Sequence, residues 1–238
     1  MEKRNVTFVL VPGAWHDPDI YYAVGKHLEA AGYRNVYVSH PSVNCKKGLD
    51  DPYADVKNVQ RVLKEVLDNG SGSNVVLVAH SYGGMVITNA VEGFTKADRE
   101  VSGQTNAVIS LAYVTAFVLP KGKSLWETNG KAPCPETTFY GDIPKDQRER
   151  WSAALGSQSY NTFKDLRVDY LGYEVVPSAY LVCTEDMAIP GFFQEKMLAD
   201  AKEGSFFLVE RMDCSHSPFL SKIEETATFL RRTAGEVL

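Results

Sequence analysis

The sequence contains no long hydrophobic run. No stretch in its 238 residues approaches the roughly 20 apolar residues that a membrane-spanning helix needs. The apolar run at residues 6–11 is too short for a secretory signal and passes directly into a glycine turn, and the final GEVL matches no known targeting signal. We therefore expect a cytoplasmic protein with no membrane partner.

The sequence also lacks an excess of positive charge. It has 25 lysines and arginines against 30 aspartates and glutamates, which gives a net charge of −5. This balance offers no electrostatic reason to bind nucleic acid or an anionic membrane. We predict no nucleic-acid partner, and the composition leaves the oligomeric state open.

Cysteine pairs are missing as well. The four cysteines are scattered, with no C-x-x-C pair and no spacing typical of metal ligands: Cys45, Cys134, Cys183 and Cys214. In a chain of this length they are expected as free thiols. We predict neither a metal site nor a cofactor.

What the chain does contain is a regular alternation of strand and helix signals. Segments that look like strands occur at 6–11, 35–40, 74–80, 106–114, 177–184 and 205–211, and several of them are continuously apolar, as expected when helices cover both faces of the sheet. Helix signals follow at Asp17-Pro18, at Asp51-Pro52, after Gly84, after Pro190 and at Ser217-Pro218. The pattern predicts an α/β fold with a mostly parallel six-stranded sheet and helices on both faces.

One segment interrupts this alternation. Residues 121–174 contain no strong strand, and such a length is far beyond an ordinary loop. Aromatic residues are frequent there, including Trp126 and Trp151, which argues against disorder. We predict a small helical cap at 121–174, inserted in a core domain made of residues 1–120 and 175–238.

The segment VAHSYGG, residues 78–84, ends a strand and opens a helix. A nucleophilic serine needs this context, because a tight strand-to-helix turn exposes its hydroxyl. The residues two positions before and after the serine must be small, so that the strand and the helix do not clash. Here they are Ala79 and Gly83, whereas the usual motif has glycine at both positions. A serine in a glycine turn can also be purely structural, so Ser81 needs a base and an acid to be a nucleophile.

Among the five histidines, His216 is the best candidate for that base. His27 lies in a predicted helix, His80 points away from Ser81 by strand alternation, and His40 precedes a long polar segment. His216 lies between the last strand and the last helix. In a parallel sheet of this order, the loop after the last strand would bring His216 close to Ser81.

The acid should follow the preceding strand, where LVCTEDMAIP supplies Asp186. Glu185 is its rival and Asp213 a weaker one. The order Ser81, Asp186, His216 is the order expected of an α/β-hydrolase.

Acyl transfer also needs two oxyanion donors. We expect them to be the backbone N–H groups of Tyr82 and of Ala14, in the loop that Gly13 opens.

Together, FVLVPGAW, VAHSYGGMVI, AFVLP, VCTEDMAIP and HSPFL resemble the α/β-hydrolase superfamily. The resemblance is to the small esterase branch with plant methyl esterases and hydroxynitrile lyases. It implies a serine hydrolase that cleaves a carboxylic ester, lactone or thioester of a small, largely apolar molecule. The residues expected to line its substrate site are Gly13, Trp15, Phe117, Trp126 and Trp151.

Two other classes of function stay open. A lyase or cyclase could use Ser81 and His216 as a proton relay. Hydroxynitrile lyases of this branch carry a threonine and a lysine where this chain has Gly13 and Ser217, which argues against cyanohydrin cleavage. A ligand-binding protein on the same fold is the third possibility, because fold alone does not determine function.

Overall fold

The computed structural model describes residues 5–69, 72–129 and 135–238. Within them the chain forms one six-stranded sheet in the order β2-β1-β3-β4-β5-β6, and every neighbouring pair is parallel. The strands are β1 Val6–Val11, β2 Arg34–Tyr37, β3 Asn74–Ser81, β4 Val108–Ala116, β5 Ser178–Cys183 and β6 Phe206–Met212. The predicted fold class is confirmed.

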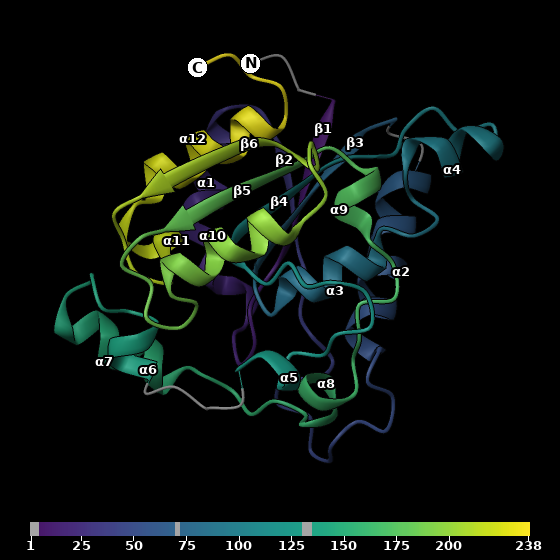
Figure 1. Cartoon of the computed structure of the whole chain (residues 1–238). Coiled ribbons are helices and arrows are strands. Elements are labelled where there is room, and N and C mark those ends of the chain that lie inside the picture. Colours follow the sequence, from purple (N-terminus) through teal and green to yellow (C-terminus); the bar gives the residue numbers. More distant parts are fainter. Residues whose placement is uncertain (1–4, 70–71, 130–134) are drawn as a thin grey trace.

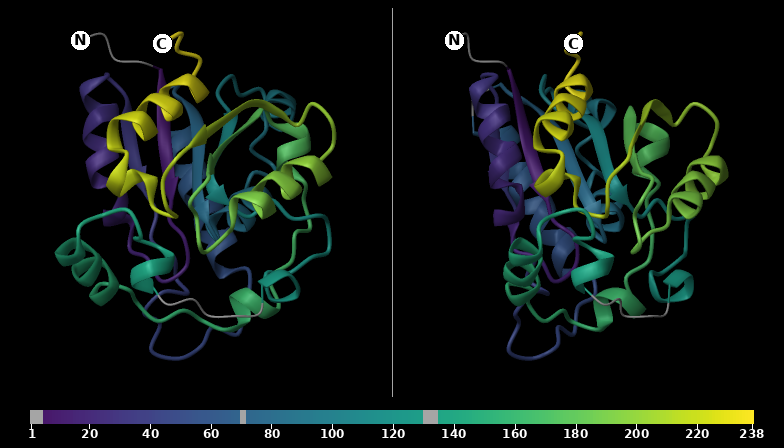
Figure 2. Two further views of the ribbon diagram at one scale, coloured as in Figure 1. Left: turned by 60° about the vertical axis from the view of Figure 1, so that its left-hand side comes forward. Right: turned by 90° about the vertical axis from the view of Figure 1, so that its left-hand side faces the viewer.

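Helices cover both faces of the sheet (Figures 1 and 2). One face packs against α1 Tyr22–Ala30, α11 Pro218–Ser221 and α12 Ile223–Thr233. The other face packs against α2 Ala54–Asp68, α3 Gly83–Ala90, α9 Gly172–Val175 and α10 Gly191–Asp200. A further helix, α4 Lys96–Val101, follows α3 and begins with a capping box between Thr95 and Asp98.

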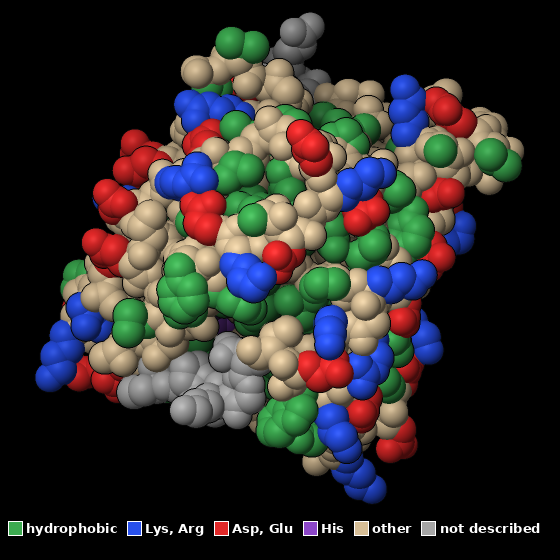
Figure 3. Space-filling model, viewed as in Figure 1, with side chains coloured by type: hydrophobic (Ala, Val, Ile, Leu, Met, Phe, Trp, Pro, Cys, Tyr) green, Lys and Arg blue, Asp and Glu red, His purple; other side chains and the backbone are tan. Residues whose placement is uncertain are grey.

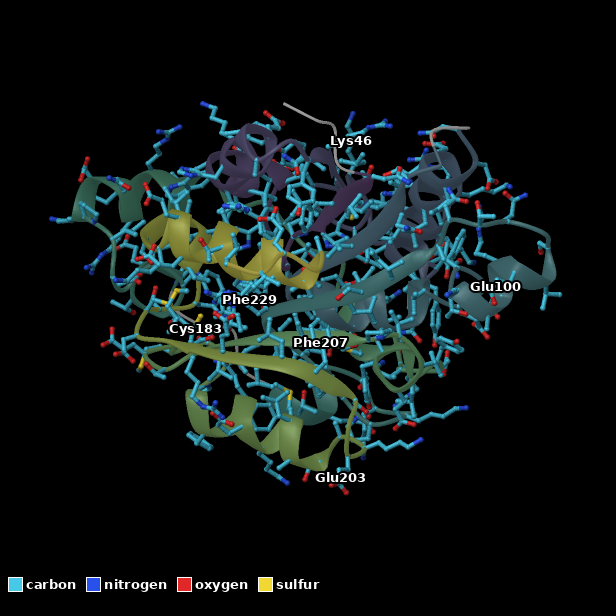
Figure 4. All side chains as sticks on the ribbon, turned by 90° about the horizontal axis from the view of Figure 1, so that it is seen from above. Lys46, Glu100, Cys183, Glu203, Phe207 and Phe229 are labelled. Carbon is cyan, nitrogen blue, oxygen red and sulfur yellow. The ribbon has the colours of Figure 1, made fainter. Side chains whose placement is uncertain are left out.

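The strand sequences account for this layering. Successive side chains point to opposite faces, so Val9 and Val11 join one core cluster while Phe8 and Leu10 join the other. Figure 4 labels Phe229, a fully buried side chain of α12 that joins the second cluster. Each such fully buried aliphatic or aromatic side chain contributes about 1.5–3 kcal/mol to folding.

Two predicted helix starts need correction. After Asp17 the chain forms a short 3-10 turn, η1 Pro18–Tyr21, and Asp17 makes no side-chain cap hydrogen bond. The helix α2 begins at Ala54, because the Asp51 carboxylate accepts the N–H of Tyr53 at 3.0 Å and forms a turn ahead of the helix. In both places the acidic residue and proline make a turn before the helix proper.

Residues 121–174, the inserted segment, connect β4 to β5. They form α5 Trp126–Asn129, α6 Pro135–Thr138, α7 Lys145–Ala153 and α8 Asn161–Lys164, and they end within α9. In the ribbon views α5 to α8 lie beyond the carboxyl ends of the strands (Figures 1 and 2). The loops after β1, β3, β5 and β6 open at this same edge, where parallel α/β sheets bind ligands.

Candidate active site

Ser81 occupies a strained turn between β3 and α3. Its φ of 51° is in the left-handed region, which a serine adopts at a cost of order 1–3 kcal/mol. The glycines after it permit the close packing of this turn. A Cβ on Gly83 would lie 2.6 Å from the Pro12 carbonyl oxygen, and one on Gly84 would lie 2.4 Å from that of Phe117. The backbone therefore holds Ser81 at the carboxyl edge of the sheet.

Asp186 and His216 are brought together from the loops after β5 and β6. His216 Nδ1 lies 2.7 Å from Asp186 Oδ2, and both side chains are buried. Since an ionised carboxylate only accepts, Nδ1 carries the proton. This tautomer leaves Nε2 with a free lone pair, as a general base requires.

The acid is itself tightly held. Its Oδ1 accepts the N–H groups of Ala188 at 2.7 Å and Ile189 at 2.9 Å, and its Oδ2 accepts the amide of Gln194 at 3.1 Å. The hydroxyl of Thr115, at the end of β4, donates to the same Oδ2 and lies 3.2 Å from His216 Nδ1. By contrast, the side chains of Glu185 and Asp213 are exposed. Of the three carboxylates considered, Asp186 is the one that contacts His216.

Ser81 is partly exposed, and within the described residues its hydroxyl forms no hydrogen bond with His216. Such contacts are often long in the absence of substrate. The imidazole of His216 lies under Phe139 of the inserted segment, with ring centroids 5.4 Å apart at an interplanar angle of 31°. A hydrophobic ring therefore shields the candidate base from water.

Two further buried histidines lie beside His216. His80 Nε2 donates to the His216 carbonyl at 2.9 Å, and His16 bridges the Ala14 carbonyl and the Tyr140 hydroxyl, each at 2.7 Å. Burial lowers the pKa of His16 to about 4 and the pKa of His80 well below its usual range. Both are therefore neutral near pH 7, and they position the loops around the site.

The expected oxyanion donors lie on the two loops that meet at Ser81. A Cβ on Gly13 would lie 3.1 Å from Ser81 Cβ, so the loop after β1 passes directly beside the serine. Within the described residues, the N–H groups of Ala14 and Tyr82 donate to no protein acceptor. The predicted oxyanion donors therefore have no competing protein acceptor there, as such a role requires.

Some of the residues expected to bind substrate lie near Ser81 and others do not. Trp15 packs against Phe139 and Phe163 with ring centroids 5.8 and 5.3 Å apart, and Phe117 donates its N–H to the Ser81 carbonyl at 3.0 Å. Trp126 is half exposed and packs on Tyr160, while Trp151 packs against the cluster on the α1 side. The structure thus brings Gly13, Trp15 and Phe117 near Ser81. Within the described residues, no ring contact or hydrogen bond joins Trp126 or Trp151 to Ser81, Asp186 or His216.

Several contacts at the site come from residues that sequence reasoning did not single out. Thr115, Gln194 and Phe139 are the clearest, since each touches Asp186 or His216. Asp142 of the inserted segment also accepts the N–H of Ser215 at 2.9 Å, next to the base. The one available signal was position: Thr115 is the penultimate residue of β4, at the edge of the sheet where Ser81 ends β3.

A separate cavity of about 210 Å³ lies between α10 and the start of the inserted segment. Its walls include Leu119, Tyr173, Phe193 and Met197, and no triad residue lines it. The surface over α10 carries hydrophobic and charged side chains side by side (Figure 3).

The part of the chain that the structure describes offers no candidate metal site and no candidate membrane span. It contains no group of three or more His, Cys, Asp or Glu side chains that could hold a metal, and none of its helices has the length and hydrophobicity of a membrane span. Cys45, Cys183 and Cys214 are free thiols, and Cys134 lies outside the described residues.

Comparisons with known proteins agree with this geometry. The model of the alpha/beta hydrolase family matches residues 8–229. The chain is 27% identical to the alpha/beta hydrolase nvfD of Aspergillus novofumigatus, over 97% of each chain, and 24% identical to methylesterase 1 of Arabidopsis thaliana, over 99% of this chain and 98% of the relative. The crystal structure of methylesterase MES16 from Arabidopsis superposes with a TM-score of 0.73 at 21% identity, covering 97% of this chain and 99% of the other. The protein belongs to the alpha/beta hydrolase family, in its branch of small esterases.

Proposed function

We propose that the protein is a serine hydrolase that cleaves a carboxylic ester, lactone or thioester through an acyl-enzyme on Ser81. The observation that carries this proposal is the buried Asp186–His216 pair beside a serine in a strained turn. The 2.7 Å contact sets the histidine tautomer that a general base needs. An esterase-like hydrolase is also what the family implies.

The proposed chemistry follows from the positions of these groups. Ser81 Oγ attacks the carbonyl carbon as its proton passes to His216 Nε2, and the carbonyl π electrons move onto oxygen. The N–H groups of Ala14 and Tyr82 bind this oxyanion. When the oxyanion collapses, the bond to the leaving group breaks and His216 gives its proton to the departing oxygen or sulfur. Water then repeats both steps on the acyl-enzyme.

We propose further that residues 121–174 form a cap that favours small, largely apolar substrates. Aromatic rings from this segment, Phe139 and Phe163, pack on Trp15 beside the oxyanion loop. Apolar walls with few polar groups are typical of small-molecule sites. Methylesterase 1 is by name an enzyme acting on methyl esters, and a short alkyl ester suits a site of this kind.

The proposal is tested with a panel of short p-nitrophenyl and methyl esters. Ester cleavage by the wild-type protein, and its loss in Ser81→Ala, are the expected results. Ser205→Ala is a matched control, because Ser205 is a buried serine before β6, at the opposite edge of the sheet. If the wild-type protein cleaves none of these esters, or if Ser81→Ala retains full activity, the proposed hydrolase is wrong and the lyase or ligand-binding alternative gains support.

A further inference from the structure

Trp15, which follows the oxyanion donor Ala14, has a φ of 66°. A bulky residue adopts this conformation only where its surroundings hold it there. The inserted segment holds Trp15 on both sides. Gln158 Oε1 accepts the Trp15 N–H at 3.1 Å, and the Gly156 N–H donates to the Trp15 carbonyl at 2.7 Å. The shape of the oxyanion loop therefore depends on a segment more than 140 residues away in the sequence.

The same glutamine connects to a buried carboxyl group. Gln158 Nε2 donates to Ser42 Oγ at 2.5 Å, and Ser42 Oγ donates to Asp55 Oδ2 at 2.5 Å. Asp55 is fully buried, and its Oδ1 accepts the Ser42 N–H at 3.0 Å. A buried carboxyl group is stable only when several donors satisfy it.

The third donor to Asp55 comes from the other half of the oxyanion hole. The Tyr82 hydroxyl donates to Asp55 Oδ2 at 2.7 Å, and Tyr82 is buried. This contact ties the residue that carries the second oxyanion N–H to the helix α2. His40 Nδ1 lies 3.6 Å from the same Asp55 Oδ2, and His40 Nε2 donates to the Pro12 carbonyl at 2.9 Å.

We propose that the partly buried Gln158 and the buried Ser42 and Asp55 form a hydrogen-bonded relay that positions the two oxyanion donors relative to each other. One end of the relay holds Trp15, next to Ala14, and the other end holds Tyr82. These are positioning residues, because none of them belongs to the triad or supplies an oxyanion N–H. The inference rests on the proposed function. It adds that attachment of the inserted segment and assembly of the oxyanion hole are coupled.

Two variants test the relay from opposite ends. Gln158→Met keeps the length of the side chain and removes its hydrogen bonds to Trp15 and Ser42. Tyr82→Phe removes the hydroxyl that reaches Asp55 and keeps the backbone N–H. Because the donors are displaced rather than deleted, we expect kcat to fall by about 10-fold or more, below the 10²–10³ typical of deleting a donor, with KM changed less than about threefold.

The second readout is affinity for a short alkyl trifluoromethyl ketone, whose adduct with Ser81 carries an oxyanion like that of the transition state. Its affinity should fall by the same factor as kcat/KM in both variants. Asn89→Leu is the matched control. Asn89 is a buried amide that holds the inserted segment elsewhere, through the N–H groups of Asp169 at 2.8 Å and Tyr170 at 3.2 Å. That variant should lower the melting temperature and leave affinity for the ketone unchanged.

The outcomes separate the two claims. If the wild-type protein binds the ketone and turns over esters but Gln158→Met and Tyr82→Phe match it in both, the relay is wrong and the hydrolase stands. If both variants and Asn89→Leu lose ketone affinity together, the residues only stabilise the fold, and the relay is again wrong. If the wild-type protein neither cleaves esters nor binds the ketone, the proposed function fails and the relay fails with it.

Discussion

At the scale of single residues, the choice of Asp186 over its neighbours is the sharpest point to test. Asp186→Asn keeps the size of the side chain and removes its charge, so His216 is no longer held in the productive tautomer. We expect kcat to fall by roughly 10⁴, as for other triad acids, with the fold intact. Glu185→Gln is the matched control, since that side chain is exposed and adjacent. Ester kinetics on both variants measure the effect. A large loss of kcat in Glu185→Gln together with an active Asp186→Asn would assign the role of the acid to Glu185.

His16 gives a residue-scale prediction about pH. Its pKa is lowered by burial from 6.5 to about 4, so at pH between these values the unfolded chain binds a proton that the folded chain does not. The stability from keeping His16 neutral is complete above pH 6.5 and is lost as pH falls toward 4. By pH 5 the loss is about 2 kcal/mol.

Urea unfolding of the wild-type protein and His16→Gln at pH 7.5 and pH 5 measures this effect. Because the glutamine does not titrate, the variant should gain about 2 kcal/mol relative to the wild type on going to pH 5. The same difference between the two proteins at both pH values would show that His16 titrates normally in the folded state.

Only those residues of the candidate site that lie in a recognisable local motif could be predicted from the sequence. Ser81 stands in a strand-to-helix motif, and Asp186 and His216 follow strands at the expected edge, so local context pointed to all three. Thr115 and Gln158 had no such context. The contact of Thr115 with Asp186 spans 71 residues and that of Gln158 with Trp15 spans 143, and nothing in the neighbouring residues encodes those contacts.

At the scale of secondary-structure elements, the inserted segment is where prediction and structure differ most in detail. Its helical character was predictable from its length and aromatic content. Which aromatic residues face the site was not, because its helices are mostly four residues long and carry little periodicity. Of the two tryptophans that stood out in the sequence, Trp126 packs on Tyr160 and Trp151 packs against the cluster that contains Phe139. The ring that stacks on His216 is that of Phe139, in the loop after α6.

This difference gives an element-scale prediction. Phe139→Ala should change the relative kcat/KM for short and bulky esters by about 10-fold or more, since a single methylene in a hydrophobic pocket already changes discrimination by about 1–3 kcal/mol. Trp151→Ala is the control. Trp151 lies on α7 and packs against the cluster that contains Phe139, but within the described residues no ring contact or hydrogen bond joins it to Asp186 or His216, so its loss should lower the melting temperature and change the ratio between esters much less than Phe139→Ala does. A change in that ratio in Trp151→Ala alone would place the specificity surface on α7 instead.

At the scale of the whole molecule, topology explains why one edge carries the chemistry. All six strands are parallel, so the loops after β1, β3, β5 and β6 open on the same side and bring residues 14, 81, 186 and 216 together. The apolar strand pattern made this arrangement predictable before any contact was known. The bounds of β1 match the prediction, and the ends of the other strands differ from it by at most three residues, because hydrogen bonding to neighbouring strands, and not hydrophobicity, decides where a strand stops.

The central claim is that this edge forms a covalent acyl-enzyme on Ser81. Intact-mass spectrometry after treatment with an alkyl fluorophosphonate tests it most directly, because the reagent phosphonylates an activated serine and mimics the tetrahedral intermediate. We expect one adduct per chain, located at Ser81 by peptide mapping, no adduct in Ser81→Ala and strongly slowed labelling in His216→Ala. An unlabelled wild-type protein, or an adduct on any other residue, would contradict the account.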